Sequence, residues 1–216
     1  RGARALALSA LLALPLAACG GGSPSVAGGR AVSAPGPQHA DTAGVDLIPP
    51  GYGTLRQDDI ALKTQLPSTL VRMIPLDESV IRLLSSDSYR AMHELKEGRR
   101  EAIAAMAARY NVRRPSLWYI SFFALETESR FSPMEIVLQS AGRDFRPLDV
   151  IPLTTGFHDQ RIKQRESQSA IYLFEDGVNL NQALTVSVEG VPNTTWESIL
   201  RSIERERSVV RSRISK

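Results

Sequence analysis

Hydrophobic positions change their spacing along the chain, and these changes predict the order of its elements. Between residues 77 and 110 apolar side chains recur about every 3.6 positions, which predicts a short helix near 77–84 and a longer one over about 88–110. Asp87 is the expected N-cap of the longer helix. Gly98 is expected to weaken or break its middle. The helical part therefore covers about 77–110.

The rest of the pattern is that of short strands. They are expected near 59–64, 69–75, 117–125, 134–139, 145–153, 169–174 and 183–188. Turn residues separate the later segments, which favours an antiparallel β-sandwich with its β-rich part at about 116–189. The layout of this region resembles that of immunoglobulin-like domains, without a residue motif that names a family. The polar stretch 154–168 is expected to be a loop.

An amphipathic helix is expected over about 195–213. Thr194 and Glu197 have the spacing of a capping box. The apolar stripe that follows consists of Trp196, Ile199, Ile203, Val210 and Ile214. Charge at Glu206–Arg207 interrupts the stripe, so we expect the helix to dock on the sheet rather than to form a coiled coil. The predicted fold class is α+β: an antiparallel β-sandwich with a preceding helical segment and a C-terminal amphipathic helix.

Composition changes sharply near residue 45. Residues 1–18 combine Arg1 and Arg4 with an apolar run and small residues, which is the layout of an export signal. Residues 19–44 are rich in Gly, Ser, Ala and Pro, which predicts a flexible tether. Residues 45–216 have the composition and length of a single globular domain.

The sequence contains one cysteine, and its surroundings are specific. Leu16-Ala17-Ala18-Cys19 resembles a lipobox, the processing site of bacterial lipoproteins. The resemblance implies cleavage between Ala18 and Cys19, a diacylglycerol on the Cys19 thiol, and a lipid anchor in the membrane. Gly20, rather than Asp, follows the cysteine. In a bacterium with two membranes this implies an outer-membrane location facing the periplasm.

Charge and motif content argue against several classes of function. The chain has 26 basic and 23 acidic residues; with Arg1 and Arg4 removed in the signal, the balance is near neutral and does not support nucleic-acid binding. His39, His93 and His158 share no metal-binding spacing, so neither a metal nor a cofactor is expected. No Gly-x-Ser-x-Gly motif of a hydrolase is present.

The best candidate surface lies in the polar stretch. His158, Arg161, Lys163 and Arg165 could contact an anionic ligand or an envelope protein partner. The carboxylates of Glu126 and Glu128 are expected to be solvated rather than catalytic. We therefore expect a membrane-anchored cell-envelope lipoprotein whose domain is a non-enzymatic binding or assembly module. The alternative is an envelope hydrolase with a site around His158 and a carboxylate.

Overall fold

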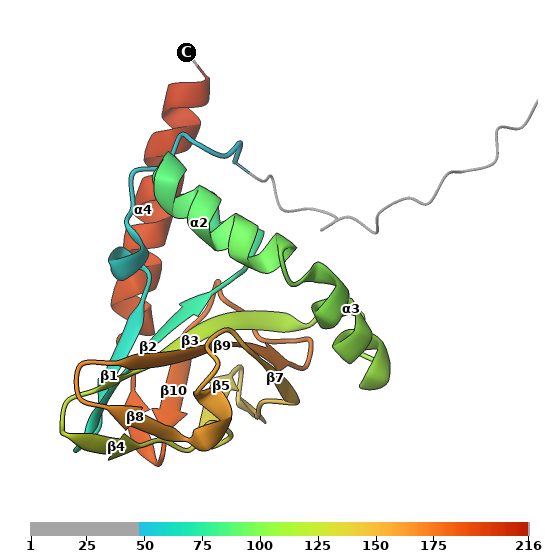
Figure 1. Ribbon diagram of the computed structural model, residues 1–216. Coiled ribbons are helices and arrows are strands. Elements are labelled where there is room, and N and C mark those ends of the chain that lie inside the picture. The colour runs from blue at the N-terminus through green and yellow to red at the C-terminus, as the bar shows by residue number, and fades with distance from the viewer. Residues whose placement is uncertain (1–47, 216) are drawn as a thin grey trace, which may run out of the picture. The chain divides into compact units, whose positions relative to one another are not determined.

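The strands pair in three antiparallel sheets in the part of the chain described by the computed structural model, residues 48–215 (Figure 1). The predicted export signal, Cys19 and the predicted tether, which includes His39, lie outside these residues. The first sheet has the order β1 (Leu62–Gln65), β2 (Thr69–Pro75), β3 (Ser116–Ala124), β9 (Ser167–Phe174), β7 (Asp149–Pro152). The second has the order β11 (Val191–Asn193), β10 (Leu184–Val188), β5 (Ile136–Ser140), β6 (Arg143–Phe145). The third is a ribbon of β4 (Glu128–Arg130) and β8 (Arg161–Lys163).

Four helices complete the α+β fold. They are α1 (Glu78–Ile81), α2 (Ser86–Glu97), α3 (Arg100–Arg109) and α4 (Trp196–Ile214), with 3-10 turns at Gln57–Asp59 and Phe157–Asp159. None of these described helices combines the length and apolar character needed to cross a membrane. The predicted α+β class and the C-terminal helix are confirmed.

The first two sheets contribute to one hydrophobic core. In β3 alternate side chains are fully buried, as the period of two in a strand requires: Trp118, Ile120, Phe122 and Ala124. Val186 and Val188 of β10 are buried in the same cluster. At the edges, the Asn193 amide donates to Lys63 O (2.9 Å) and to Thr64 Oγ1 (3.1 Å), which links β11 to β1.

Two expectations about the strands are wrong. The segment 145–153 is not one strand but the end of β6 and all of β7, which belong to different sheets. Pro147 lies between them and has no N–H for a ladder. The stretch 154–168 is not simply a loop, because β8 lies within it and pairs with β4. Strands of three residues are too short to show alternation.

The long helix breaks at Gly98, as expected, into α2 and α3. Its N-cap is Ser85 and not Asp87. Ser85 N–H donates to Leu55 O (2.8 Å), and Ser85 O accepts the first helical bond from Tyr89 N–H (2.8 Å). A contact with a distant segment therefore sets the start of α2, while Asp87 stays in solvent beside Arg90.

The capping box expected at Thr194 and Glu197 is absent. Asn193 Oδ1 instead accepts from Thr195 N–H (2.9 Å) and Thr195 Oγ1 (2.6 Å), just before α4 begins. Glu197 pairs with Arg201 (3.3 Å) one turn on. Trp196 packs on Trp118 with ring centroids 6.1 Å apart, which docks α4 on the sheet as predicted.

The two charged residues that interrupt the apolar stripe of α4, Glu206 and Arg207, form hydrogen bonds with distant segments of the chain. Glu206 Oε1 accepts from Thr54 N–H (2.8 Å) and from Thr54 Oγ1 (2.9 Å). Arg207 donates to Ser79 O (3.4 Å). The interruption in the hydrophobic pattern is thus where α4 binds the chain that precedes β1 and the start of α1.

Glu78 joins α1 to α2 through a shared carboxylate. Arg82 Nε donates to Oε2 (2.8 Å), while Lys96 Nζ and His93 Nδ1 (3.3 Å) contact Oε1. Burial alone would raise the pKa of Glu78, but the hydrogen bonds from Lys96 and Arg82 outweigh it and lower the pKa from 4.5 to about 2. The ionised carboxylate is therefore strongly favoured in the folded state.

We expect Glu78→Gln to lower the free energy of unfolding at pH 7 by roughly 2 kcal/mol, since the bound charge is lost. Because the folded pKa is depressed, this contribution is fully present above about pH 4.5 and is lost as the pH falls towards 2. Urea unfolding from pH 7 to pH 2.5 measures it. The two proteins should converge at low pH. Glu94→Gln, an exposed change on α2, should have the same free energy of unfolding as the unmodified protein at each pH. A difference in free energy of unfolding between Glu78→Gln and the unmodified protein that stays constant across this pH range would contradict the linkage.

Candidate functional site

An aromatic cluster positions the ribbon β4–β8 against the main core. Phe131, just after β4, stacks on Phe122 of β3 with centroids 4.3 Å apart. Phe157 packs at 5.3 Å from Phe131. A backbone hydrogen bond also connects the two segments: Phe131 N–H donates to Gln160 O (3.3 Å). Although it is only two short strands, the ribbon is therefore fixed on the domain.

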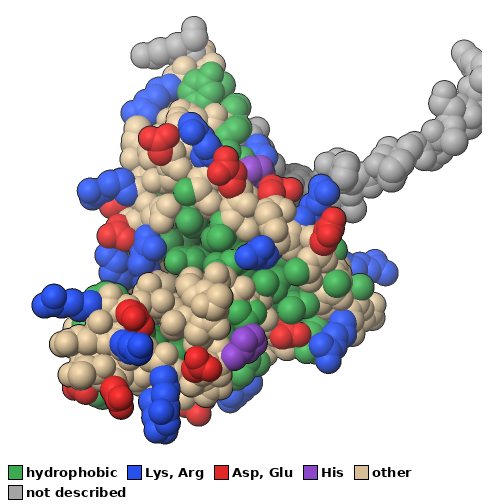
Figure 2. Space-filling view, in the orientation of Figure 1, with side chains coloured by type: hydrophobic (Ala, Val, Ile, Leu, Met, Phe, Trp, Pro, Cys, Tyr) green, Lys and Arg blue, Asp and Glu red, His purple; other side chains and the backbone are tan. Residues whose placement is uncertain are grey.

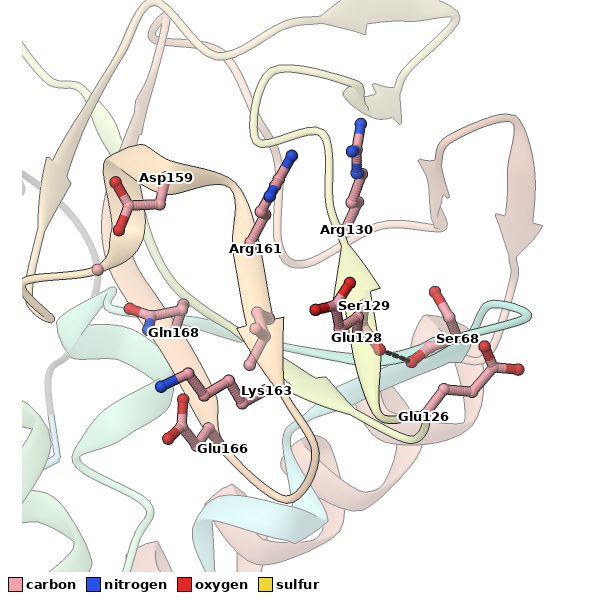
Figure 3. Close-up of a pocket in the computed structure, with 12 residues that line it drawn as sticks. Ser68, Glu126, Glu128, Ser129, Arg130, Asp159, Arg161, Lys163, Glu166 and Gln168 are labelled. Carbon is pink, nitrogen blue, oxygen red and sulfur yellow. Dashed lines mark hydrogen bonds between the residues drawn. The ribbon is translucent and has the colours of Figure 1, made fainter.

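The register of the ribbon separates a buried pair from charged pairs. Ser129 lies opposite Ile162, and both are buried. Ser129 Oγ donates to Ser68 O (2.7 Å), the bond drawn in Figure 3. The pairs Glu128–Lys163 and Arg130–Arg161 are exposed. The alternation thus places all four charged side chains of the ribbon on its solvent side.

These side chains border an open hollow of about 920 Å³. Its lining is Ser68, Glu126, Glu128, Ser129, Arg130, Gly156, Asp159, Arg161, Ile162, Lys163, Glu166 and Gln168. Most of the lining residues are polar or charged, with charges of both signs, which suits recognition of a polar ligand or partner more than an apolar one.

Arg130 and Arg161 are the most unusual pair in the hollow. They are direct cross-strand neighbours, and Figure 3 shows their side chains extending side by side in the same direction. Within residues 48–215 neither guanidinium has a hydrogen bond or an ion pair. Like charges directly opposite each other in a ladder are destabilising. A carboxylate or phosphate held between the two guanidinium groups would remove this repulsion and could accept bidentate hydrogen bonds.

Comparisons with known proteins find no matching family model, no matching curated protein and no matching solved structure.

The structure brings two of the four candidate residues into the hollow. Arg161 and Lys163 line it through β8. His158 is exposed and lies outside this lining, with its ring edge-on to Phe157 at 6.5 Å. Arg165 also lies outside it, in the turn before β9 with φ of 64°. No group of three or more His, Cys, Asp and Glu side chains that could hold a metal occurs among the described residues.

Sequence reasoning missed the residues that β4 contributes. The sequence does not indicate Arg130, and it predicts solvated carboxylates at Glu128 and at Glu126, which precedes β4. Both carboxylates remain exposed but line the hollow. The available signal was the charge alternation in Glu128-Ser129-Arg130 and Arg161-Ile162-Lys163, with one small or apolar residue between two charges in each. Only the pairing of the two strands makes them one surface.

Proposed function

We propose that this chain is a lipid-anchored lipoprotein of the bacterial cell envelope whose domain is a non-enzymatic binding module. The observation that carries the proposal is Leu16-Ala17-Ala18-Cys19 after an export-signal pattern, with no second cysteine in the sequence. Residues 20–44 then serve as a tether. With about 25 residues, a flexible chain of this composition reaches roughly 25–30 Å. In a bacterium with two membranes the domain faces the periplasm.

Replacing Cys19 with serine is the direct test of the anchor. We expect the unmodified chain, expressed in a bacterium, to fractionate with membranes and to carry lipid mass on Cys19. Cys19→Ser should lose both, because serine cannot form the thioether. Ser23→Ala, a matched change in the tether, should keep both. Mass spectrometry and membrane flotation measure the outcome. An unmodified Cys19 in the membrane-bound protein would contradict the anchor.

We propose further that the hollow beside the ribbon β4–β8 is the ligand-binding surface. Its support is the pair Arg130–Arg161, whose charges lie opposite each other without partners in the described part of the chain. The ligand feature that fits this pair is an exposed carboxylate or phosphate of an envelope component. Lys163 and the neighbouring carboxylates would contact its polar surroundings.

Chemical cross-linking in intact cells, followed by capture of the full chain, tests this surface. We expect a reproducible cross-linked component whose yield falls at least about tenfold in Arg130→Gln/Arg161→Gln, since each charge-assisted hydrogen bond contributes about 1.5–3 kcal/mol. The control is Arg113→Gln/Arg146→Gln, two exposed arginines outside the hollow. No reproducible component, or equal loss in both variants, would contradict the binding surface.

The five- and four-stranded sheets fit the two layers of a β-sandwich, and we include this architecture in the proposal. Its support is that alternate residues of both sheets enter one core, while Asn193 ties their β11 and β1 edges. We propose an immunoglobulin-like layout only in the general sense of two antiparallel sheets packed around a common core.

A further inference from the structure

The last turns of α4 extend beyond the sheets (Figure 1). The apolar stripe of the helix continues into this end. Val210 is fully buried, but Ile214, one turn on, is 42% exposed. Val209 is exposed to the same extent. The described part of the domain covers the stripe only as far as Val210, so its last member contacts solvent.

The first described residues run beside the same end of the helix. Arg213 Nη1 donates to Tyr52 O (3.2 Å), and Thr54 is bound to Glu206, about two helical turns earlier in α4. Tyr52 is 50% exposed, the largest exposure of any large hydrophobic side chain in the described chain. The chain therefore enters the domain next to the exposed end of α4, and it brings an aromatic side chain there.

The charge of this end is basic. Arg205, Arg211 and Arg213 are exposed. The Glu206 side chain is only 11% exposed; it accepts hydrogen bonds from Thr54 and lies 4.0 Å from Arg213 Nη1, so it neutralises only part of this basic charge. Figure 2 shows hydrophobic side chains gathered along one side of the protruding end, with Lys and Arg side chains, and some acidic ones, on the other side. Aromatic, aliphatic and arginine side chains together are typical of segments that lie at the surface of an anionic membrane.

We propose that this end, defined by Tyr52, Val209, Arg211, Arg213 and Ile214, is a membrane-facing surface that docks on anionic lipid headgroups. The inference rests on the proposed lipid anchor. The chain between the proposed anchor at Cys19 and the domain reaches the described residues at Ile48, four positions before Tyr52, so the anchor raises the local concentration of this surface at the bilayer. The arginines attract the headgroup phosphates. Tyr52 and Ile214 enter the interface between headgroups and acyl chains. In Figure 1 the strands β4 and β8 lie at the opposite end of the view from the end of α4, so the hollow that they line stays in solvent.

The test uses the full lipidated chain in vesicles, with a polarity-sensitive fluorophore on Ile214→Cys. Cys19 is blocked by its thioether, so only the new thiol reacts. We expect a blue shift of the emission in vesicles that contain phosphatidylglycerol and little shift in phosphatidylcholine alone. Salt should reverse the shift. The same fluorophore on Thr127→Cys, exposed in the turn before β4, should stay unshifted in both vesicles.

Variants that lack two of the arginines measure how much the basic charge contributes to docking. Each basic residue near an anionic surface contributes about fivefold to binding, so Arg211→Gln/Arg213→Gln should lower the ratio of docked to undocked domain about 25-fold. Circular dichroism checks that α4 is intact in the double variant. If that variant does not fold, the salt dependence of the shift in the chain that keeps both arginines tests whether their charge drives docking.

Each remaining outcome is distinct. A chain that fails to float with vesicles overturns the anchor and the docking surface together. A chain that floats without a shift at position 214 overturns the docking surface alone. A shift that appears only when envelope proteins are added, and not with lipid, overturns a membrane surface in favour of a protein contact.

Discussion

Replacing Gly53 with alanine is expected to destabilise the domain by about 3 kcal/mol, at the upper end of the costs of overpacking. A Cβ at this position would lie 2.0 Å from the Leu83 carbonyl oxygen and 2.1 Å from its carbon. These are backbone atoms, so they cannot turn aside as the end of a flexible side chain could. Thermal unfolding should shift down by roughly 6–12 °C for a domain of this size.

The same substitution has a structural signature besides the loss of stability. Leu55 N–H donates to Leu83 O (3.2 Å), and Leu55 O accepts from Ser85 N–H (2.8 Å), so a displaced residue 53 breaks this pair first. Hydrogen exchange at Leu55 and Ser85 should increase more than exchange in β3. Gly98→Ala is the matched control, because Gly98 is exposed with helical dihedral angles, and it should change stability by less than about 1 kcal/mol. Equal melting temperatures for Gly53→Ala and Gly98→Ala would contradict the close approach.

The second large effect is expected from Trp196→Ala, with a loss of about 3–5 kcal/mol in the free energy of unfolding. Trp196 is fully buried and packs on Trp118, so its truncation leaves a cavity where α4 meets the sheet. Denaturant unfolding followed by circular dichroism measures the loss. The loss of helical signal should precede the loss of strand signal, because α4 is the element that is released.

Trp196→Phe distinguishes the effect of lost ring volume from the effect of removing the indole N–H. The Trp196 Nε1 atom is buried and has no hydrogen-bond partner among residues 48–215, so phenylalanine keeps much of the packing and removes an unsatisfied donor. We expect a cost below about 1.5 kcal/mol. By contrast, Trp118 Nε1 donates to Ser116 Oγ (3.1 Å), and Trp118→Phe loses that bond. If Trp196→Phe costs as much as Trp196→Ala, the indole nitrogen rather than the ring volume matters at this position.

Local patterns predicted the regular elements well where the elements are long. β2 has the bounds expected for it, and the break at Gly98 follows from the conformational freedom of glycine. The docking of α4 through its apolar stripe also follows from spacing alone. In these places the hydrophobic period and the local residue preferences indicate the same structure, so no distant contact is needed.

Contacts between distant segments decide the rest. The start of α2 depends on a bond to Leu55. The start of α4 depends on Asn193, whose side chain is itself held by Lys63 and Thr64 of β1, and a capping motif in the helix reveals neither contact. The hollow depends on pairing Arg130 with Arg161 across strands of three residues. Such short strands carry too few positions for a period to be measured, and 30 residues separate them in the chain. The close contact of Gly53 with Leu83 is likewise a property of the fold.

The segment around Thr54 also determines how the domain would bear mechanical load. A pull on the chain at Ile48 meets the bond from Arg213 to Tyr52 O and then the bonds from Thr54 to Glu206 and from Leu55 to Leu83. These bonds fasten the segment to α4 and to the chain between α1 and α2. β1, an edge strand of its sheet, comes later along the chain. Tension would therefore be carried into the helices before it could peel the sheet from its edge.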